Sequence, residues 1–160
     1  MMNVQILCVG KLKEQYLRDA CAEYSKRLGA FCKLSIVEIN ECKISNNPNQ
    51  AEIERVIETE GVSILNKIPA QSYVIPMCIE GKQMSSEQLS QKFEQVALNG
   101  ISSITFIIGG SYGLSNEIKQ RADYRLSMSC MTFPHQLARV MLLEQIYRAF
   151  SISANTKYHK

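Results

Sequence analysis

The segment from Ser127 to Phe150 constrains the fold of this chain more than any other stretch. It begins as a short apolar strand, turns at Phe133-Pro134 and continues as a long helix that is apolar nearly all round. A helix of this kind is buried on more than one side, so we predict a core helix that also packs against a second subunit. The few polar side chains of the helix are then candidates for a site, namely His135, Gln136, Arg139, Glu144, Gln145 and Arg148.

Strands and helices alternate along the rest of the chain. For example, apolar residues at every fourth position from Leu12 to Leu28 predict a helix that Gly29 ends. Apolar runs predict strands over residues 2–9, 33–39, 72–79, 103–108 and 124–128, and helical patterns cover residues 11–28, 51–67, 85–98, 115–121 and 135–150. This alternation predicts a single α/β domain over residues 1–160, with a mainly parallel central sheet flanked by helices.

Three features disturb this regular pattern. Gly61 interrupts the second predicted helix, and Pro76 removes a backbone donor from the third predicted strand. We therefore expect that strand to end or to form a bulge at Pro76. The polar segment 40–50 is rich in turn residues, so we expect an exposed, mobile loop there.

Charge and hydropathy narrow the classes of function. A net charge of +3 permits an anionic partner without requiring one, and a purely electrostatic nucleic-acid binder is usually more basic. No apolar run reaches the roughly 18 residues that a membrane span needs, and no signal peptide precedes the first predicted strand. We therefore expect a cytoplasmic protein with free thiols that makes no membrane contact.

The cysteines point to packing rather than to chemistry. The six cysteines form no C-x-x-C pair and the chain has two histidines, so we expect no metal site. Cys8, Cys78 and Cys130 lie in apolar runs, which is typical of small core residues.

Ligands of open α/β sheets bind beyond the carboxyl ends of the strands, and three such ends stand out. A glycine loop, residues 109–113, follows the fourth predicted strand, residues 77–81 end the third, and residues 127–135 lead into the last helix. The glycine loop has neither the G-x-G-x-x-G dinucleotide pattern nor the G-K-[ST] of a P-loop. Each segment is also compatible with an ordinary connection between elements.

Polar side chains near these ends offer a base and an anion ligand. His135 lies in the first turn of the last helix, where the helix dipole favours a neutral imidazole that can accept a proton. Arg139 lies one turn further on and needs a partner, either a carboxylate such as Glu144 or an anionic ligand. A lone histidine is more often structural, and Tyr158 and His159 lie in a tail of a kind that is ordinarily disordered.

The chain shows no Ser-His-Asp set, paired-carboxylate motif or metal cluster. A reaction that needs neither a metal nor a protein nucleophile therefore fits best. Methyl transfer from S-adenosylmethionine is such a reaction, because the sulfonium is already activated and the protein supplies alignment and a base.

Four motifs, taken together, make the chain recognisable. They are Val9-Gly10-Lys11-Leu12-Lys13-Glu14, Phe106-Ile107-Ile108-Gly109-Gly110 with Gly113, the block 127–149 around Thr132-Phe133-Pro134-His135-Gln136, and the terminal Tyr158-His159-Lys160. With them the chain resembles the RlmH family, the SPOUT-class methyltransferases of bacterial ribosomal RNA, over essentially its whole length. Met77 stands where that family often has leucine, and Tyr112 is bulky for the glycine loop.

The resemblance implies a fold and a cofactor site. The C-terminal part of the α/β fold would be tied in a deep trefoil knot, and the protein would work as a homodimer in which the partner completes each site. S-adenosylmethionine would bind in the knot, in a bent form, against three loops. Those loops map onto Met77, onto Gly109, and onto Met128, Ser129, Cys130, Met131, Thr132 and Phe133.

The resemblance also implies a reaction, which is methylation of N3 of a pseudouridine in the helix-69 loop of 23S rRNA on assembled 70S ribosomes. His135, Arg139, Tyr158 and His159 would lie on the RNA-facing side of the site. His135, or else His159 of the partner subunit, would take the N3 proton, and Arg139 would hold a phosphate or a developing oxyanion. A non-catalytic ribosome-associated module with the same fold is the alternative. An ordinary doubly wound nucleotide-binding enzyme is disfavoured because the glycine pattern is wrong.

Overall fold

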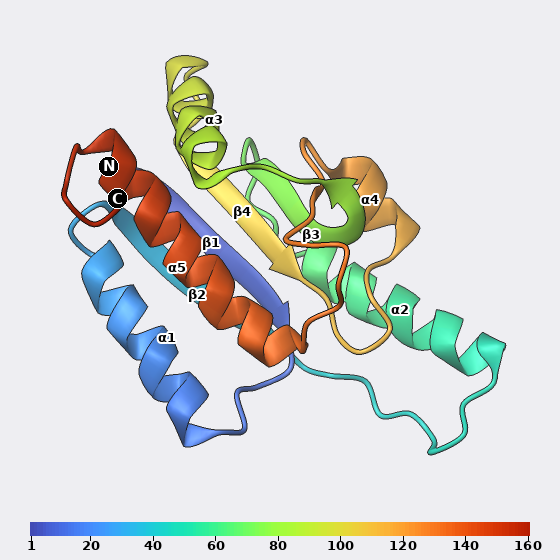
Figure 1. The fold of residues 1–160 in the computed structure, drawn as a ribbon. Helices are drawn as coiled ribbons and strands as arrows, with labels where there is room; N and C mark the ends of the chain where they lie inside the picture. The colour runs from blue at the N-terminus through green and yellow to red at the C-terminus, as the bar shows by residue number, and fades with distance from the viewer.

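A four-stranded, all-parallel sheet forms the centre of the computed structural model, which describes residues 1–160 (Figure 1). The strands are β1 (Met2–Val9), β2 (Cys32–Ile39), β3 (Tyr73–Lys82) and β4 (Ser103–Ile108), in the order β2-β1-β4-β3. The helices are α1 (Gln15–Leu28), α2 (Gln50–Leu65), α3 (Ser86–Leu98), α4 (Asn116–Arg121) and α5 (His135–Ser153). The α/β fold with a parallel sheet flanked by helices is therefore confirmed.

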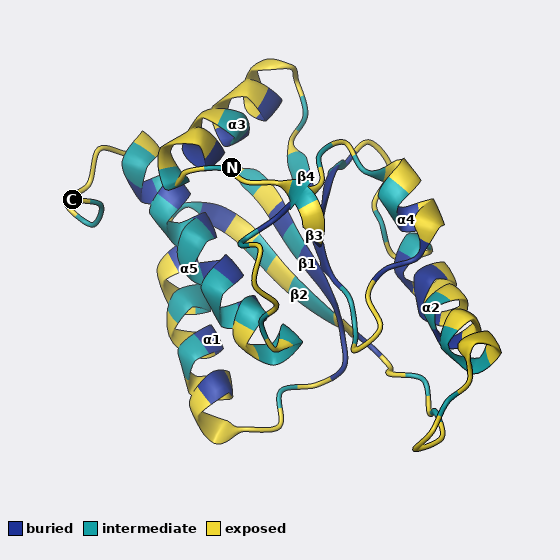
Figure 2. Ribbon diagram, turned by 45° about the vertical axis from the view of Figure 1, so that its right-hand side comes forward, coloured by how far each residue is buried: buried dark blue, intermediate teal, exposed yellow.

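Helices cover both faces of this sheet and divide the core in two (Figures 1 and 2). Alternate residues of β1 point to opposite faces, as they must in a strand. Val4 and Ile6 belong to the larger core, which α1, α3 and α5 close, whereas Leu7 and Val9 belong to the smaller core under α2 and α4. The carboxyl ends of all four strands meet at one edge of the sheet because the strands are parallel.

Helix α5 lies between α1 and α3 and is the central helix of its layer (Figure 1). Its side chains at Leu142, Leu143, Ile146 and Ala149 are at most 1% exposed. Burial of each of the three larger ones stabilises the fold by about 1.5–3 kcal/mol. Within the helix only Leu137 and Ser153 are exposed, so the predicted core helix is confirmed. The second subunit stays a prediction.

The predicted strand at residues 124–128 is wrong. Leu126 makes isolated bridges to Met77 and Lys82 and no ladder. The reason is that this segment bonds to two separate points of β3. The amides of Asp123 and Tyr124 donate to the carbonyl of Val74, and Lys82 pairs with the backbone on either side of Leu126.

Smaller differences have local causes. Helix α1 begins at Gln15 rather than at residue 11, because Arg18 donates to the carbonyl of Leu12 and holds the preceding residues in a loop. Gly61 does not interrupt α2. A Cβ at Gly61 would stand 2.6 Å from Ser115 Oγ, so the glycine lets α2 and the start of α4 approach closely.

Pro76 is accommodated because β3 is an edge strand. The ladder between β3 and β4 ends at Pro76, whereas β3 itself continues to Lys82. Most of the segment 40–49 is exposed, as expected for a loop. At the start of α3, Ser85 and Gln88 form a reciprocal capping box.

Candidate functional site

A cavity of about 390 Å³ opens where the carboxyl ends of β3 and β4 meet the segment before α5. Three loops build its wall: the end of β3, the glycine loop after β4, and residues 126–133. Seven of the eight positions expected to hold the cofactor line it, namely Met77, Gly109, Met128, Ser129, Met131, Thr132 and Phe133. We call this space the loop cavity. Residues more than 50 positions apart in the sequence thus converge on one small volume.

Cys130 is the exception among the eight positions. Its side chain is exposed, and its Sγ accepts a hydrogen bond from Gln83 Nε2 at 3.6 Å, outside the loop cavity. The prediction that Cys130 is a core residue is therefore wrong, whereas Cys8 and Cys78 are buried as predicted. Cys130 lies in a loop that turns outward rather than in a strand, which the apolar run around it did not reveal.

Hydrogen bonds within the chain fix the shape of the segment that leads into α5. Ser127 Oγ donates to the carbonyl of Ser129, and Ser129 Oγ in turn accepts from the amide of Met131, both at 3.0 Å. The amides of Met128, Thr132 and Phe133 donate no hydrogen bond to any other group of the chain. These backbone donors remain free for a ligand at the wall of the loop cavity.

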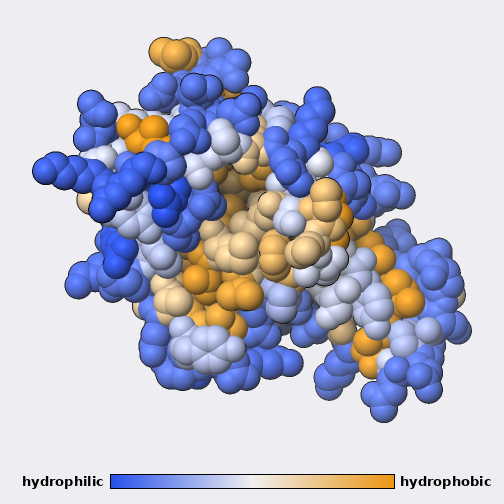
Figure 3. All heavy atoms as spheres, in the orientation of Figure 1, coloured by the Kyte–Doolittle hydropathy of each residue, from blue (hydrophilic) through white to orange (hydrophobic).

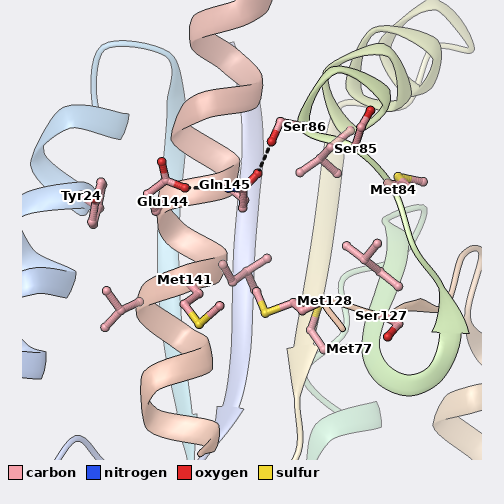
Figure 4. A pocket seen from close by; sticks show the side chains of 14 residues that line it. Tyr24, Met77, Met84, Ser85, Ser86, Ser127, Met128, Met141, Glu144 and Gln145 are labelled. Atoms are coloured by element: carbon pink, nitrogen blue, oxygen red, sulfur yellow. Dashed lines mark hydrogen bonds between the residues drawn. The ribbon is translucent and has the colours of Figure 1, made fainter. Parts of the chain in front are cut away.

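A second cavity, of about 530 Å³, is also lined by Met77 and Met128 (Figure 4). Figure 3 shows that apolar side chains gather in a hollow at the centre of this face. Both cavities share four lining residues, which are Met77, Leu126, Ser127 and Met128. We call it the helix cavity, because α5 and α3 form much of its wall. Sequence reasoning missed it, although several of its residues are methionines, which suit adaptable apolar surfaces.

The polar end of the helix cavity is ordered by hydrogen bonds between α3 and α5 (Figure 4). Ser86 Oγ donates to Gln145 Oε1 at 2.6 Å, and Gln145 Nε2 donates to Glu144 Oε2 at 2.8 Å. The polar residues of α5 at these positions therefore face a shared space between helices.

His135 is the first residue of α5 and lines the loop cavity. Its Nε2 lies 3.8 Å from the point that a Cβ on Gly10 would occupy, at the end of β1. Gly10 has a φ of +89°, which an L side chain rarely adopts, so glycine both forms the turn and leaves space beside the imidazole. The half-buried imidazole stands at the border between the cavity and the carboxyl edge of the sheet.

Arg139 lies one turn further along α5, and its guanidinium is bonded to other groups of the chain. It is 3% exposed, its Nη1 donates to Glu38 Oε2 at 2.8 Å, and its Nη2 donates to the carbonyl of Gly10 at 3.1 Å. The partner of Arg139 is thus a carboxylate, as one of the two sequence interpretations required, but it is Glu38 rather than Glu144. A direct contact between Arg139 and RNA would require these bonds to break.

Tyr158 and His159 fold back onto the C-terminal half of α5. Tyr158 Oη donates to Glu144 Oε1 at 3.1 Å, the two ring nitrogens of His159 contact Arg148 and Glu87, and Arg148 pairs with Glu144. Glu144 lies nine residues after His135, or about 14 Å along an α-helix. Within one chain the structure therefore does not bring the tail together with His135.

Burial raises the pKa of Tyr158 to about 12, and hydrogen bonds with Tyr24 and Glu144 act in the same direction. The phenol therefore remains protonated at neutral pH and can donate a hydrogen bond. A protonated phenol is poorly suited to act as a general base, so His135 and His159 stay the candidates for that role.

Glu60 is a buried carboxyl group that sequence reasoning missed. It is 5% exposed, its Oε2 accepts from the amide of Cys42 at 3.0 Å, and its Oε1 lies 3.2 Å from the point that a Cβ on Gly110 would occupy. Burial raises the pKa of Glu60, and the nearby Glu41 adds to this effect against the hydrogen bond from Cys42. Glu60 thus lies directly beside Gly110 of the glycine loop.

The raised pKa of Glu60 predicts a pH-dependent stability. The folded state holds this proton more tightly than the unfolded state, so the contribution of Glu60 to stability falls as pH rises from about 4.5 through the folded-state pKa. The free energy of unfolding of Glu60→Gln, minus that of the wild type, should therefore increase over this range and then level off. Chemical denaturation at a series of pH values measures it, and a difference that does not change with pH would contradict the assignment.

No group of three His, Cys, Asp or Glu side chains is placed to hold a metal ion. No helix is both long and apolar enough to cross a bilayer.

Comparison with known proteins agrees with this geometry. Residues 2–159 match the family model described as "Predicted SPOUT methyltransferase". A protein of Leuconostoc mesenteroides named ribosomal RNA large subunit methyltransferase H is 52% identical over 159 residues, which cover 99% of this chain and 100% of that one. Proteins with the same name from Clostridium perfringens and Streptococcus thermophilus are 52% and 50% identical, again over 99% of this chain and 100% of theirs.

Solved structures show the same fold at much lower identity. A probable methylase family protein from Haemophilus influenzae superposes with a TM-score of 0.53 at 14% identity, covering 99% of this chain and 71% of that one. A putative methylase family protein from Neisseria gonorrhoeae superposes with a TM-score of 0.51 at 14% identity, covering 91% of this chain and 82% of that one. The predicted family is thus confirmed: the chain belongs to the SPOUT methyltransferases and, within them, groups with the proteins named ribosomal RNA large subunit methyltransferase H.

Proposed function

We propose that this protein methylates N3 of a pseudouridine in the helix-69 loop of 23S rRNA, with S-adenosylmethionine as the methyl donor and the assembled 70S ribosome as the substrate. Full-length relatives about 50% identical to it bear the name of a methyltransferase of large-subunit ribosomal RNA. The observation that carries the proposal is the loop cavity, where seven of the eight expected cofactor residues converge beside His135. A ribosomal substrate also implies a cytoplasmic site of action.

The loop cavity suits S-adenosylmethionine in its chemistry. Most of its lining is apolar, which fits an adenine ring, and free backbone donors at Met128, Thr132 and Phe133 can read the edge of a base. Gly109 allows a tight approach of the glycine loop, because a Cβ there would stand 2.9 Å from Leu114 and 3.0 Å from Gly113. Met77 stands where the family often has leucine, and it keeps that part of the cavity wall apolar.

The chain's own residues then supply alignment and a base. When bound, S-adenosylmethionine provides a methyl group that its sulfonium has already activated, so no protein nucleophile is required. The loop segment 128–133 and the glycine loop orient the donor. Pseudouridine N3 must lose a proton as it gains the methyl group, and His135, which lines the loop cavity, is our candidate to accept it.

A homodimer would give the C-terminal tail, residues 158–160, a role in the reaction. Tyr158 contacts Glu144, which lines the helix cavity about 14 Å along α5 from His135 of the same chain. His159 contacts Arg148, one turn further along α5, and Glu87 of α3. We propose that the tail of one subunit completes the site of the other, so that His159 of the partner subunit is the second candidate base. Deletion of residues 158–160 should then abolish methyl transfer, yet leave the donor affinity of the dimer unchanged in calorimetry. Full activity of the truncated protein would contradict the role of the tail.

The trefoil knot is also part of the proposal. Its support is that residues 123–127 bond to both ends of β3, at Val74 and at Lys82, before the chain continues into α5. Mechanical unfolding from the two termini should leave a tightened knot and thus a contour length shorter than that of a free chain of 160 residues. An unfolded length equal to that of a free chain would contradict the knot.

Two measurements test the function itself. Calorimetry should show that the protein binds S-adenosylmethionine, which a non-catalytic module of the same fold would fail to do. Methyl transfer from labelled donor should be faster on 70S ribosomes than on free 50S particles. Equal transfer to both would remove the requirement for the assembled ribosome, and the absence of donor binding would contradict the methyltransferase proposal.

A further inference from the structure

Glu38 joins two parts of the site that are far apart in the sequence. It is the next-to-last residue of β2, where it lies opposite Cys8 of β1. Its carboxylate accepts from Arg139 of α5 across 101 sequence positions, and it forms the one ion pair that Arg139 makes. The Glu38 side chain is 37% exposed, whereas that of Arg139 is 3% exposed. Glu38, at the carboxyl edge of the sheet, is therefore the half-exposed counter-ion of the buried Arg139 guanidinium.

The guanidinium of Arg139 depends on these partners. Arginine remains charged in proteins, and a buried charge is costly unless it is paired and hydrogen-bonded. The carbonyl of Gly10 satisfies Nη2 and Glu38 satisfies Nη1, whereas Nε is buried without a partner. The environment of Arg139 is thus already incompletely satisfied, and loss of the Glu38 carboxylate would leave the charge without its counter-ion.

The first turn of α5 has little else to fix it. Its N-cap is Pro134, no side chain caps the free amides, and the first turn contains no acidic residue. Its position therefore rests on contacts with other elements. Among them are the bond from the amide of Lys13 to Gln136 Oε1 at 2.9 Å and the Arg139 contact with Glu38 and Gly10.

We propose that Glu38 is a positioning residue for the methyl-transfer site. Through Arg139 it fixes the first turn of α5 over the end of β1, and so it sets where His135 stands and how residues 128–133 leave the loop cavity. The ion pair acts as a clamp whose two halves come from β2 and α5, with the Gly10 carbonyl between them. The inference rests on the proposed function for the identity of the reaction, but the clamp itself can be observed without it.

The kinetics of the Glu38→Gln variant test the role of Glu38 in the reaction. The substitution keeps the shape of the side chain and removes its charge. Because displacement of catalytic groups by about 1 Å can cost about 100-fold in rate, we expect kcat to fall by 10- to 100-fold while KM for ribosomes stays within about twofold. Glu38→Asp keeps the charge on a shorter side chain and should lose less. The matched control is Glu23→Gln, which breaks a Glu–Arg pair on the exposed surface of α1 and should leave kcat unchanged.

Imidazole NMR separates positioning from a merely structural role. The chain has two histidines, so each ring signal can be assigned by one substitution. Glu38→Gln should shift or broaden the signals of His135 and leave those of His159 unchanged, whereas Glu87→Gln, which removes the carboxylate charge beside His159, should do the reverse.

The outcomes are distinct. An unchanged kcat with unchanged His135 signals would overturn the inference. A second outcome would also overturn it. In that outcome, thermal melting shows that activity is lost only because less protein is folded, and the His135 signals of the folded fraction match those of the wild type. If the wild type fails to methylate ribosomes but its His135 signals respond to Glu38→Gln, the proposed function fails and the clamp stands.

Discussion

Replacing His135 with alanine is expected to lower methyl transfer to ribosomes by about 100- to 10,000-fold, the usual contribution of a positioned acid or base. The affinity for S-adenosylmethionine should stay close to that of the wild type, because the half-buried His135 is one polar residue in a lining that is mostly apolar. Single-turnover kinetics with labelled donor measure the first effect, and calorimetry measures the second. The expected signature is therefore lost turnover with retained binding.

The matched variant is His159→Ala, since the chain has one other histidine. If His135 is the base, His159→Ala should keep most of the rate of the chemical step. If the losses are reversed, the base is His159 of the partner subunit. Normal methylation by both variants would show that neither imidazole accepts the N3 proton.

Substitution of Gly81 with alanine is expected to be the most damaging single change to the fold around the site. A Cβ at this position would stand 2.7 Å from the carbonyl oxygen of Arg125 and 3.0 Å from the carbonyl carbon of Leu126. These are backbone atoms of the segment that passes the end of β3, so no side-chain rotation relieves the contact. Overpacking of this kind lowers the free energy of unfolding by about 1–3 kcal/mol.

The same substitution should weaken binding of the methyl donor, because Leu126 and Ser127 line the loop cavity and lead directly into Met128. Chemical denaturation and calorimetry on the same preparation measure the two effects together. Gly29→Ala is the control, since its φ of −56° suits alanine and its nearest contact is 3.3 Å. Equal stability and donor affinity in Gly81→Ala and the wild type would contradict the close passage of residues 125–127.

The sequence was sufficient to predict where the loop cavity lies. The carboxyl ends of parallel strands share one edge, so Met77, Gly109 and the segment before α5 had to converge once the alternation of strands and helices was established. The family resemblance then gave individual positions within each loop. The prediction for Cys130 was wrong because its exposure depends on a local outward turn, which apolar neighbours in the sequence do not indicate.

The partners of charged groups could not be predicted in this way. Glu38 and Arg139 meet because β2 and α5 cross at the end of β1, and neither spacing nor periodicity links two residues 101 positions apart. Glu60 looked like an ordinary residue of a helix, and its burial follows from the docking of α2 beneath the glycine loop. The apolar run at 124–128 was misassigned for a related reason, because its backbone partners lie at two separate points of β3.

We propose that the loop cavity and the tail serve one reaction on ribosomal RNA. The most direct test of this proposal is nucleoside analysis of 23S rRNA after 70S ribosomes that lack the modification are incubated with the protein and methyl-labelled S-adenosylmethionine. The label should appear in a single nucleoside, N3-methylated pseudouridine, that comes from the helix-69 loop. Label in a different nucleoside, or no label in the RNA while the donor binds normally, would contradict the account.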